Sequence, residues 1–326
     1  MRVFITGGTG WVGSGIIREL KGAGHSVVAL ARTPEAADGL AAAGVTVRRG
    51  DLTDLKGLRA AATEADAVIH CAFNHSFAFS DLIGSLLVRF TRKPYFARVS
   101  RAGRTDLHAI EAMIDGLAAA PNASSKVFLS TSGIALLPSG KVGTEEDASV
   151  TWSTGGIRVA SELATLAAAH RGVRSAVIRL PPSVHGAGDK GFVPTLIDIA
   201  RKKRVSAYLG TGDNRWPAVH RDDAAVLYRV AMECLASGTV PAGSVLHGVA
   251  EQGVRFREIA GTIAGRLALG PAEPRKPRHF GFLSMFVGLD NPASAAKTQQ
   301  LTGWQPMRPG LLEDVRGPAY APPTSG

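Results

Sequence analysis

Short apolar runs alternate with amphipathic stretches through the first half of the chain. Apolar runs of strand length lie at 2–6, 26–31, 45–49, 67–72, 126–131 and 175–180. Apolar residues at helical spacing separate these runs, most clearly at 11–22, 107–119 and 159–170. Buried apolar strands that alternate with helices are typical of a parallel sheet covered on both faces. The pattern predicts an α/β fold with a doubly wound parallel sheet.

The pattern changes after Leu180, where loops rich in proline and glycine connect shorter elements. Such a change indicates a second, smaller region beside the one that carries the sheet. The last residues are rich in Pro, Ser and Gly, and we expect them to be loose. The expected bounds are 1–180 and 219–250 for the first region, 181–218 and 251–318 for the second, and 319–326 for the tail.

The first apolar run ends in a glycine-rich turn that leads directly into a helical stretch. Gly7, Gly10 and Gly13 follow Thr6 with the spacing GxxGxxG. In this setting the glycines permit a tight turn, a close approach of the backbone to a pyrophosphate, and close packing of helix on strand. The helix N-terminus then offers free N–H groups to the phosphates. We therefore expect a dinucleotide-binding Rossmann domain in the first region, with cofactor contacts from Gly7, Thr9, Gly10, Trp11, Val12 and Gly13.

The end of the second apolar run bears on the choice of dinucleotide. A carboxylate at this point accepts hydrogen bonds from the adenosine ribose and disfavours a 2′-phosphate. This chain has Arg32 and Thr33 instead, and a guanidinium group can bind a phosphate through two parallel hydrogen bonds. The alternative is that Arg32 stacks on the adenine or points to solvent. The sequence favours NADP(H) over NAD(H) as the cofactor.

Composition and charge narrow the class of protein. The chain has 326 residues, 45% of them hydrophobic, and its two cysteines lie far apart with no metal-like spacing. We therefore expect a cytoplasmic protein with no disulfide framework and no metal site. No run approaches the roughly 18 apolar residues of a membrane-spanning helix. The net charge of +10 is concentrated between Arg89 and Arg104, so we do not expect a nucleic-acid partner.

That basic segment, 82–104, also contains apolar and aromatic residues. Three interpretations compete: a lid over an anionic or apolar substrate, a helix for a membrane surface or a partner, and a solvated basic loop. Pro94 interrupts a long amphipathic helix and so weakens the membrane interpretation. Because long loops in compact folds are commonly functional, the lid is favoured.

Seven short segments along nearly the whole chain match a known pattern, at 6–13, 50–54, 70–73, 129–132, 179–186, 219–225 and 302–306. They resemble the extended and atypical branches of the short-chain dehydrogenase/reductase superfamily, as in proteins of the NAD-dependent epimerase/dehydratase type. The resemblance implies adenine contacts from Asp51 and Leu52. It also implies contacts beneath the nicotinamide ribose from Ala72 and Phe73, and one beside the nicotinamide from Pro181. Relatives of this kind are often homodimers.

The same resemblance places the family's active-site hydroxyl at Ser132 and exposes one departure. Family members usually carry Tyr-x-x-x-Lys on the following helix, where Lys binds the ribose and Tyr exchanges a proton with the substrate oxygen. When Glu162 is aligned with the family's acidic residue, Arg158 falls at the Lys position and Thr154 at the Tyr position. Arg158 can still bind the ribose, whereas a threonine hydroxyl is a poor proton donor.

Other residues are candidates for the proton donor and for substrate contacts. His185 lies on the loop that reaches the nicotinamide in the family, and histidine suits acid–base work near neutral pH, although a loop histidine often binds backbone instead. His75 and Tyr95 are weaker candidates for the same task. Arg215 and Trp216 would face an anionic and an apolar part of the substrate, unless Arg215 caps a helix.

These expectations combine into an NADP(H)-dependent oxidoreductase that acts on a carbonyl or alcohol group of a small to medium organic substrate. Its mechanism is atypical, with Ser132, Arg158 and His185 as the catalytic candidates and His75, Tyr95, Arg215 and Trp216 as the substrate contacts. Two alternatives stay open. One is a non-catalytic NADP(H)-binding sensor or interaction protein, and the other is an epimerase or dehydratase that retains its cofactor.

Overall fold

A computed structural model describes the backbone of residues 1–73 and 93–321, with side chains for 1–73 and 101–321. The chain forms two compact units. Unit 1 comprises Met1–Ser132, Gly155–Ile178 and Tyr228–Val245, and unit 2 comprises Gly133–Thr154, Arg179–Leu227 and Leu246–Gly326.

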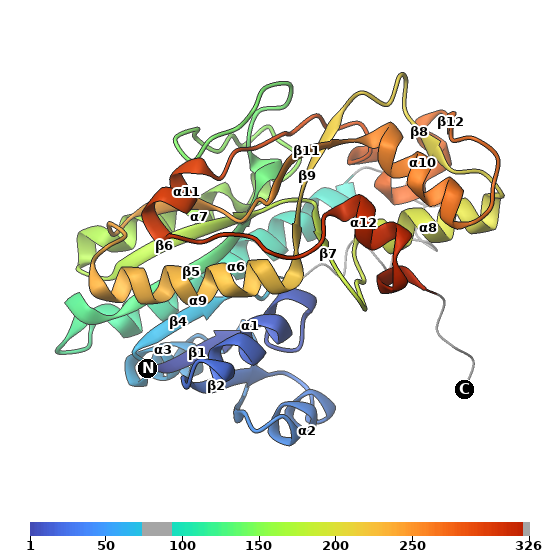
Figure 1. Cartoon of the computed structure of the whole chain (residues 1–326). Coiled ribbons are helices and arrows are strands. Elements are labelled where there is room, and N and C mark those ends of the chain that lie inside the picture. The colour runs from blue at the N-terminus through green and yellow to red at the C-terminus, as the bar shows by residue number, and fades with distance from the viewer. Residues whose placement is uncertain (74–92, 322–326) are drawn as a thin grey trace. The chain divides into compact units, whose positions relative to one another are not determined.

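Unit 1 is built on a seven-stranded sheet with the strand order β10-β6-β5-β4-β1-β2-β3 (Figure 1). The strands are β1 (Arg2–Thr6), β2 (Ser26–Ala31), β3 (Thr46–Arg49), β4 (Ala67–His70), β5 (Val127–Gly133), β6 (Arg174–Leu180) and β10 (Ser244–His247). β1 pairs in parallel with β2 and β4, β2 with β3, and β4 with β5. The strand order moves outward from β1 in both directions, which confirms the predicted doubly wound fold.

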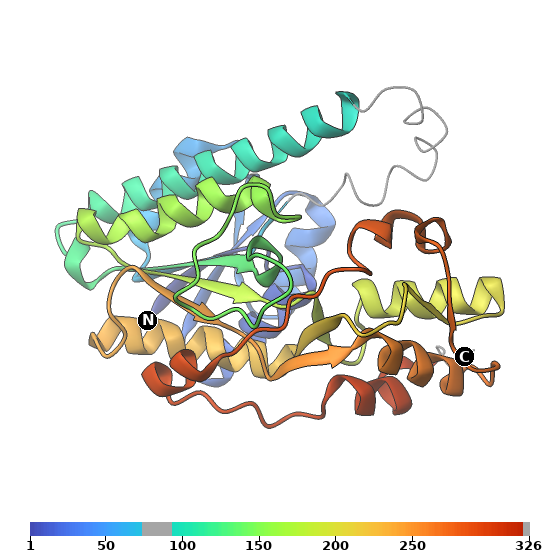
Figure 2. The same cartoon turned by 90° about the horizontal axis from the view of Figure 1, so that it is seen from above.

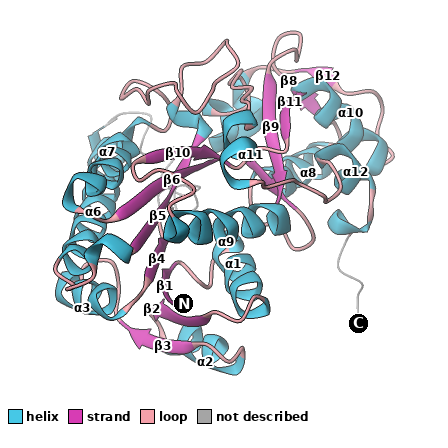
Figure 3. Ribbon diagram, turned by 60° about the vertical axis from the view of Figure 1, so that its left-hand side comes forward, coloured by secondary structure: helices cyan, strands magenta, loops and turns pink. Residues whose placement is uncertain are grey.

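Helices cover both faces of this sheet (Figure 3). One face carries α1 (Trp11–Gly22), α2 (Pro34–Ala42) and α9 (Arg221–Ser237), and the other carries α3 (Leu55–Glu64), α6 (Lys93–Ala118) and α7 (Val159–Ala167). Figure 2 shows α6 and α7 side by side. Under α3 and α6 the apolar core includes Phe4, Leu58, Ile110, Met113 and Phe128. All of these side chains are at most 1% exposed, as expected for a buried parallel sheet.

Local sequence signals explain several helix starts. Thr33 caps α2 by accepting a hydrogen bond from the Ala36 N–H, with Pro34 as the first helical residue. Asp54 caps α3 in the same way through the Gly57 N–H. The strands predicted at 2–6 and 26–31 and the helix predicted at 11–22 coincide with β1, β2 and α1.

Unit 2 has two small sheets and its own core. β7 (Ser183–His185), β9 (Arg215–His220) and β11 (Glu251–Arg255) form a sheet in the order β11-β9-β7, and β8 (Ala207–Tyr208) pairs with β12 (Glu273–Pro274). The helices are α8 (Phe192–Lys203), α10 (Phe256–Arg266), α11 (Ala296–Thr302) and α12 (Leu311–Arg316). Trp216, Phe256 and Phe280 are at most 1% exposed and centre the core.

The units differ from the predicted regions in several places. Four segments that were expected in the first region belong to unit 2, namely 133–154, 179–180, 219–227 and 246–250. The tail was expected to be loose from residue 319, but Pro318–Tyr320 forms a 3-10 helix. The Tyr320 hydroxyl donates to Asp189 at 2.6 Å, and the Tyr320 carbonyl accepts from Arg266 Nε at 3.0 Å. These long-range bonds hold residues whose local composition predicts a loose chain.

No helix in the part of the chain that the structure describes is long and apolar enough to cross a membrane.

Candidate active site

The turn after β1 is shaped by its glycines. Gly7 has a positive φ of 75°, and a Cβ there would lie 2.6 Å from the Ala72 nitrogen. A Cβ on Gly13 would lie 2.1 Å from the Gly7 carbonyl oxygen, so no other residue fits without moving the backbone. The Gly10 N–H closes the turn by donating to the Gly7 carbonyl at 2.9 Å. The glycines therefore bring α1, the turn and the backbone of Cys71 and Ala72 into close contact.

The N-terminus of α1 is suited to an anion. Its N-cap residue, Gly10, has no side chain to occupy the first N–H groups, and the first turn contains no acidic residue. Within the described residues, the Val12 and Gly13 N–H groups have no hydrogen-bond acceptor. A pyrophosphate fits these donors and the positive end of the helix dipole.

The residues predicted to contact the adenosine lie at and just after the ends of β2 and β3. Asp51 Oδ1 accepts hydrogen bonds from the Thr53 hydroxyl at 2.6 Å and from the Thr53 N–H at 2.7 Å. These bonds hold the pKa of Asp51 below its usual value, so this carboxylate is charged. Leu52 is partly buried and packs against the core of unit 1. Arg32 is exposed and forms no ion pair within the described residues.

Arg49 is a second cation at this edge that the sequence analysis did not single out. It is the last residue of β3 and pairs in the sheet register with Ala31, the residue before Arg32. Arg49 is exposed, and no described residue forms an ion pair with it. Glu35 lies within its electrostatic reach, and its pKa is lowered by hydrogen bonds at the start of α2 and, less strongly, by Arg49. The signal available in the sequence was an arginine at the end of the third apolar run.

Arg158, at the N-cap of α7, extends its side chain toward the ends of β4 and β5. Its Nη2 donates to the Thr131 carbonyl at 2.6 Å, and its Cζ lies 4.4 Å from the centre of the Phe73 ring. The second contact is a cation–π interaction. Because Ala72 contacts Gly7, this arrangement brings Arg158, Phe73, Ala72 and the glycine turn together. The sequence grouped these residues only through the family resemblance.

A buried polar network lies beneath Arg158. The His70 ring is hydrogen-bonded to the Thr6 hydroxyl through Nδ1 at 2.7 Å and to Asp106 Oδ1 through Nε2 at 3.1 Å. Asp106 Oδ2 lies 3.6 Å from Arg158 Nε. Burial opposes ionisation of Asp106, but Arg158 and His70 outweigh it and hold its pKa below the usual value. Sequence reasoning missed Asp106, although it is the first acidic residue after a run of basic ones.

The Ser132 hydroxyl donates its hydrogen bond to another side chain. It is buried and donates to Glu162 Oε2 at 2.7 Å. A serine hydroxyl has one proton to donate, so Ser132 cannot donate to a substrate oxygen while this bond lasts. The preceding residue, Thr131, shares a hydrogen bond of 2.7 Å with the buried Tyr228 hydroxyl and donates to Cys71 Sγ at 3.2 Å. Burial raises the pKa of Cys71 to about 11, so this thiol is not an anion at neutral pH.

His185 does not have the surroundings of a general acid that reaches a substrate. It is 1% exposed, and its Nδ1 lies 2.7 Å from Asp314 Oδ2. Burial lowers its pKa, against the opposing effects of Asp314 and Glu251. The structure therefore corrects the prediction of a catalytic role: the ring is enclosed in unit 2 and bonded to a carboxylate on α12.

The two residues on β9 that were predicted to contact the substrate, Arg215 and Trp216, contact other side chains of unit 2. Trp216 is fully buried, with its ring centre 4.9 Å from that of Phe256, so it belongs to the core and not to a substrate wall. Arg215 forms a two-pronged ion pair with Asp290, with Nε–Oδ1 and Nη2–Oδ2 distances both of 2.9 Å. This geometry uses the guanidinium fork that an anionic substrate would need. The prediction for Trp216 is wrong because its ring is buried in the core of unit 2, whereas a substrate contact from Arg215 stays a prediction.

The remaining predicted residues are placed as follows. Pro181 is buried in unit 2. His75, and residues 82–92 of the basic segment, lie outside the described residues, and the side chain of Tyr95 does so as well. The structure thus brings together the predicted cofactor residues of unit 1, together with Ser132 and Arg158.

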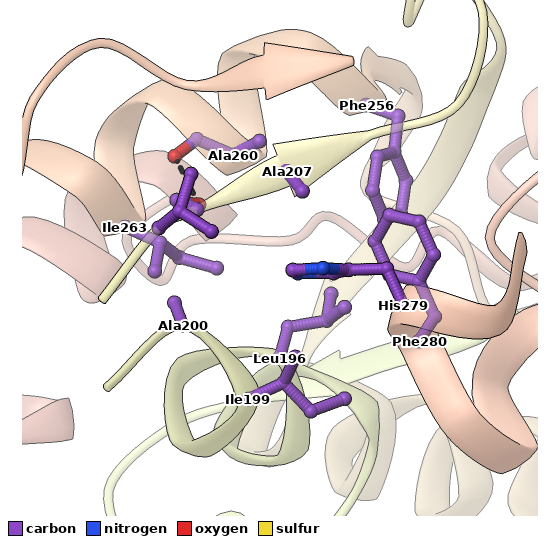
Figure 4. A pocket seen from close by; sticks show the side chains of 11 residues that line it. Leu196, Ile199, Ala200, Ala207, Phe256, Ala260, Ile263, His279 and Phe280 are labelled. Carbon is purple, nitrogen blue, oxygen red and sulfur yellow. Dashed lines mark hydrogen bonds between the residues drawn. The ribbon is translucent and has the colours of Figure 1, made fainter. Parts of the chain in front are cut away.

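Figure 4 shows a small pocket within unit 2. Leu196, Ala207, Phe256 and Ile263 line it together with His279. His279 Nε2 is buried and has no hydrogen-bond partner among the described residues. The cavity volume of about 10 Å³ leaves room for roughly one water molecule, so it is part of the core packing.

The chain is similar to known proteins along its whole length. A family model described as NAD dependent epimerase/dehydratase matches residues 3–89. An uncharacterised protein of Schizosaccharomyces pombe is 42% identical over 324 residues, covering 98% of this chain and 100% of that protein. The 2-alkyl-3-oxoalkanoate reductase of Stenotrophomonas maltophilia is 28% identical over 252 residues, covering 74% of this chain and 68% of that protein.

A solved structure is similar to the fold of this chain. DesIV, a dTDP-glucose 4,6-dehydratase of Streptomyces venezuelae crystallised with NAD, has a TM-score of 0.71 at 19% identity, covering 97% of this chain and 96% of that chain. The glycine turn, the helix N-terminus behind it and this sheet define a dinucleotide-binding Rossmann protein. Within that class, the chain belongs to the NAD-dependent epimerase/dehydratase family of extended short-chain dehydrogenases/reductases. The resemblance seen in the sequence is confirmed.

Proposed function

We propose that this protein is an NADP(H)-dependent oxidoreductase that interconverts a carbonyl and an alcohol on a small to medium organic substrate. The observation that carries the proposal is the convergence, within unit 1, of the glycine turn, Phe73 and the Arg158 guanidinium. The name of the Stenotrophomonas maltophilia relative describes a ketone reduction, which supports a carbonyl as the reacting group. When bound, the cofactor supplies or accepts the hydride.

The preference for NADP(H) rests on two arginines at neighbouring strand ends. Arg32 follows β2 and Arg49 ends β3, and the register of these strands places Arg49 beside Ala31. Both guanidinium groups are exposed, and neither has an ion-pair partner among the described residues. Two such donors suit a 2′-phosphate, since charge-assisted bonds from arginine to phosphate are strong and directional.

Arg158 is proposed to bind oxygen atoms of the cofactor ribose or of the substrate. Arg158 Nη2 donates to the Thr131 carbonyl, and the guanidinium lies over the Phe73 ring. Nη1 makes no hydrogen bond within the described residues. A guanidinium donates hydrogen bonds but does not give up its proton in proteins. Arg158 therefore stabilises negative charge on an oxygen without delivering the proton, which is an electrostatic role.

Titration with NADPH and NADH tests the cofactor assignment. For Arg32→Ala and Arg49→Ala we expect at least about tenfold weaker binding of NADPH and little change for NADH, because each variant loses a charge-assisted contact of roughly 1.5–3 kcal/mol. Arg2→Ala is the matched control, since it removes the same charge at the amino end of β1, where Arg2 pairs with Glu64. If both nucleotides bind the wild type equally, or neither binds, the NADP(H) assignment fails.

Turnover tests the reaction itself. NADPH consumption is measured with a panel of ketones and 3-oxo acids for the wild type, Arg158→Lys and Arg158→Ala. We expect turnover by the wild type, a partial loss for the lysine variant, and a loss of at least about a hundredfold for the alanine variant, as is found when a donor to a developing oxyanion is removed. An alanine variant with unchanged kcat would overturn the role assigned to Arg158.

One observation favours a non-catalytic NADP(H)-binding protein as the second candidate. The Ser132 hydroxyl donates its hydrogen bond to Glu162, and α7 contains no tyrosine. Neither of the two hydroxyls that the family uses is therefore available here to protonate a substrate. Tight binding of NADPH without turnover on any carbonyl would favour this candidate. Turnover without net redox change, with cofactor retained through purification, would instead indicate an epimerase or dehydratase.

A further inference from the structure

Asp106 is buried, charged and only partly satisfied. It is 1% exposed and lies on α6, where its Oδ1 is hydrogen-bonded to His70. Its Oδ2 has no hydrogen-bond partner among the described residues. Leaving a buried carboxylate oxygen unpaired is costly, so such an atom in a folded protein calls for a compensating group.

The compensating group is the Arg158 guanidinium. Arg158 Nε is likewise buried and without a hydrogen-bond partner in the described structure, and it lies 3.6 Å from Asp106 Oδ2. The two unsatisfied atoms therefore face each other just beyond hydrogen-bond distance. Active-site hydrogen bonds are often long without ligand and shorten in the complex. The Ser161 hydroxyl, also buried without a partner, is a competing donor for the same carboxylate.

Hydrogen bonds link Asp106 Oδ1 back to the glycine turn. The Ala72 N–H donates to the Thr6 hydroxyl oxygen at 3.3 Å, and the same hydroxyl lies 2.7 Å from His70 Nδ1. Because an ionised carboxylate only accepts hydrogen bonds, His70 donates from Nε2 to Asp106 Oδ1. His70 and Thr6 thus hold Oδ1, while Oδ2 is left to face the Arg158 guanidinium.

We propose that Asp106, held by His70 and Thr6, is the positioning residue for Arg158, and that the Asp106–Arg158 pair closes to a hydrogen bond when nucleotide binds. This proposal rests on the proposed function, because Arg158 needs to be positioned only if it binds a nucleotide or a substrate. The network begins at Thr6, directly before the glycine turn, and ends at the guanidinium above Phe73. The same buried side chains thus support the phosphate-binding turn and the oxygen-binding arginine.

A double-mutant cycle on nucleotide affinity tests the pairing. NADPH is titrated into the wild type, Asp106→Asn, Arg158→Ala and the double variant, with circular dichroism to verify folding. We expect Asp106→Asn to weaken binding at least about tenfold in the wild-type background and less than about twofold in the Arg158→Ala background, since a positioning residue has no effect once the positioned group is removed. An equal loss in both backgrounds means that Asp106 only supports the fold, and it would overturn the proposal.

Ser161→Ala is the matched control on the same helix as Arg158. It removes the competing donor without changing charge, and we expect NADPH affinity to stay within about twofold of the wild type. If this variant reproduces the effect of Asp106→Asn, the partner of Asp106 is Ser161, and the proposal is wrong.

Melting temperatures without nucleotide test the pair independently of the proposed function. Removing Arg158 leaves Asp106 as an uncompensated buried charge, so Asp106→Asn should lower the melting temperature of the wild type but raise that of Arg158→Ala. The same sign in both backgrounds would contradict the pairing. If the wild type binds neither NADPH nor NADH, the proposed function is wrong. The melting temperatures would still test whether Asp106 and Arg158 form a pair.

Discussion

Gly13 and Gly22 lie on the same helix, α1, but in opposite surroundings. A Cβ on Gly13 would meet the Gly7 carbonyl oxygen at 2.1 Å, whereas one on Gly22 would meet nothing within 4 Å. We expect Gly13→Ala to abolish NADPH binding and lower the melting temperature. Gly22→Ala should leave binding unchanged and stabilise the protein by up to about 1 kcal/mol through the unfolded state. Calorimetry and NADPH titration measure both effects. Unimpaired binding by Gly13→Ala would show that the turn does not contact the cofactor.

His185 predicts how stability depends on pH. Its pKa in the folded protein lies below the usual value of 6.5, because burial outweighs the effects of Asp314 and Glu251, while His220 lowers it further. The unfolded chain therefore takes up the proton first, so stability is full above about pH 6.5 and falls as the pH decreases below it. Melting temperatures from pH 7.5 to 5.5 measure this loss, which should be smaller in His185→Gln. Parallel curves for the two proteins would show that another group is responsible.

Among the elements of unit 2, α12 is capped by a residue of α10. Arg266, the last residue of α10, donates from Nη1 to the carbonyls of Val315 and Gly317 at 2.9 and 2.8 Å and to that of Arg316 at 3.2 Å. Its Nε donates to the Tyr320 carbonyl. The last carbonyls of a helix have no partner within it, so this guanidinium satisfies groups that α12 cannot.

Removing this cap should destabilise unit 2. We expect Arg266→Ala to lower the free energy of unfolding by about 2 kcal/mol and to speed proteolysis after α12, because several carbonyls lose a charged donor. Guanidinium denaturation and limited proteolysis provide the measurements. Arg257→Ala is the control, since its ion pair with Asp213 is exposed and should contribute less than about 1 kcal/mol. Similar losses for both variants would refute the capping role.

The elements also show where sequence reasoning succeeds and where it fails. Strand and helix bounds could be predicted within a few residues, because periodicity is a local property that burial on a parallel sheet imposes directly. The start of α6 was missed, since Pro94 was interpreted as a helix breaker. In the structure Pro94 is the second residue of α6, where a proline needs no hydrogen-bond partner for its nitrogen and is well tolerated.

For the molecule as a whole, nucleotide binding should slow hydrogen exchange more in unit 1 than in unit 2. At about 100 times its dissociation constant, a ligand that binds only the folded state stabilises it by about 2.7 kcal/mol. We expect NADPH to slow hydrogen exchange in Thr6–Gly13 and Cys71–Phe73, which contact each other in unit 1. Exchange in Phe256–Arg266, within the core of unit 2, should change little. Equal protection in both segments would show that the two units respond as one cooperative body.

The candidate site could be predicted from the sequence only where its chemistry is local. The glycine turn is a single run of eight residues, so its spacing and its position between a strand and a helix indicate phosphate binding. The network of Thr6, His70 and Asp106 joins residues 64 and 36 positions apart, and it exists only because β1 pairs with β4 while α6 packs beside them. Trp216 was predicted to contact the substrate but is buried in the core of unit 2. A short motif gives no information on whether a side chain is buried.

The contact between Asp106 and Arg158 constrains how this chain can change over evolution. A lysine at position 158 carries all its N–H donors on one nitrogen, whereas Arg158 donates to the Thr131 carbonyl from Nη2 and faces Asp106 with Nε, so lysine does not reproduce this arrangement. Restoring the family's Tyr-x-x-x-Lys by changing positions 154 and 158 alone would leave a poorly compensated buried carboxylate. A return to the common mechanism therefore passes through a change at Asp106, and the arginine and the aspartate are expected to be gained or lost together among descendants of this sequence.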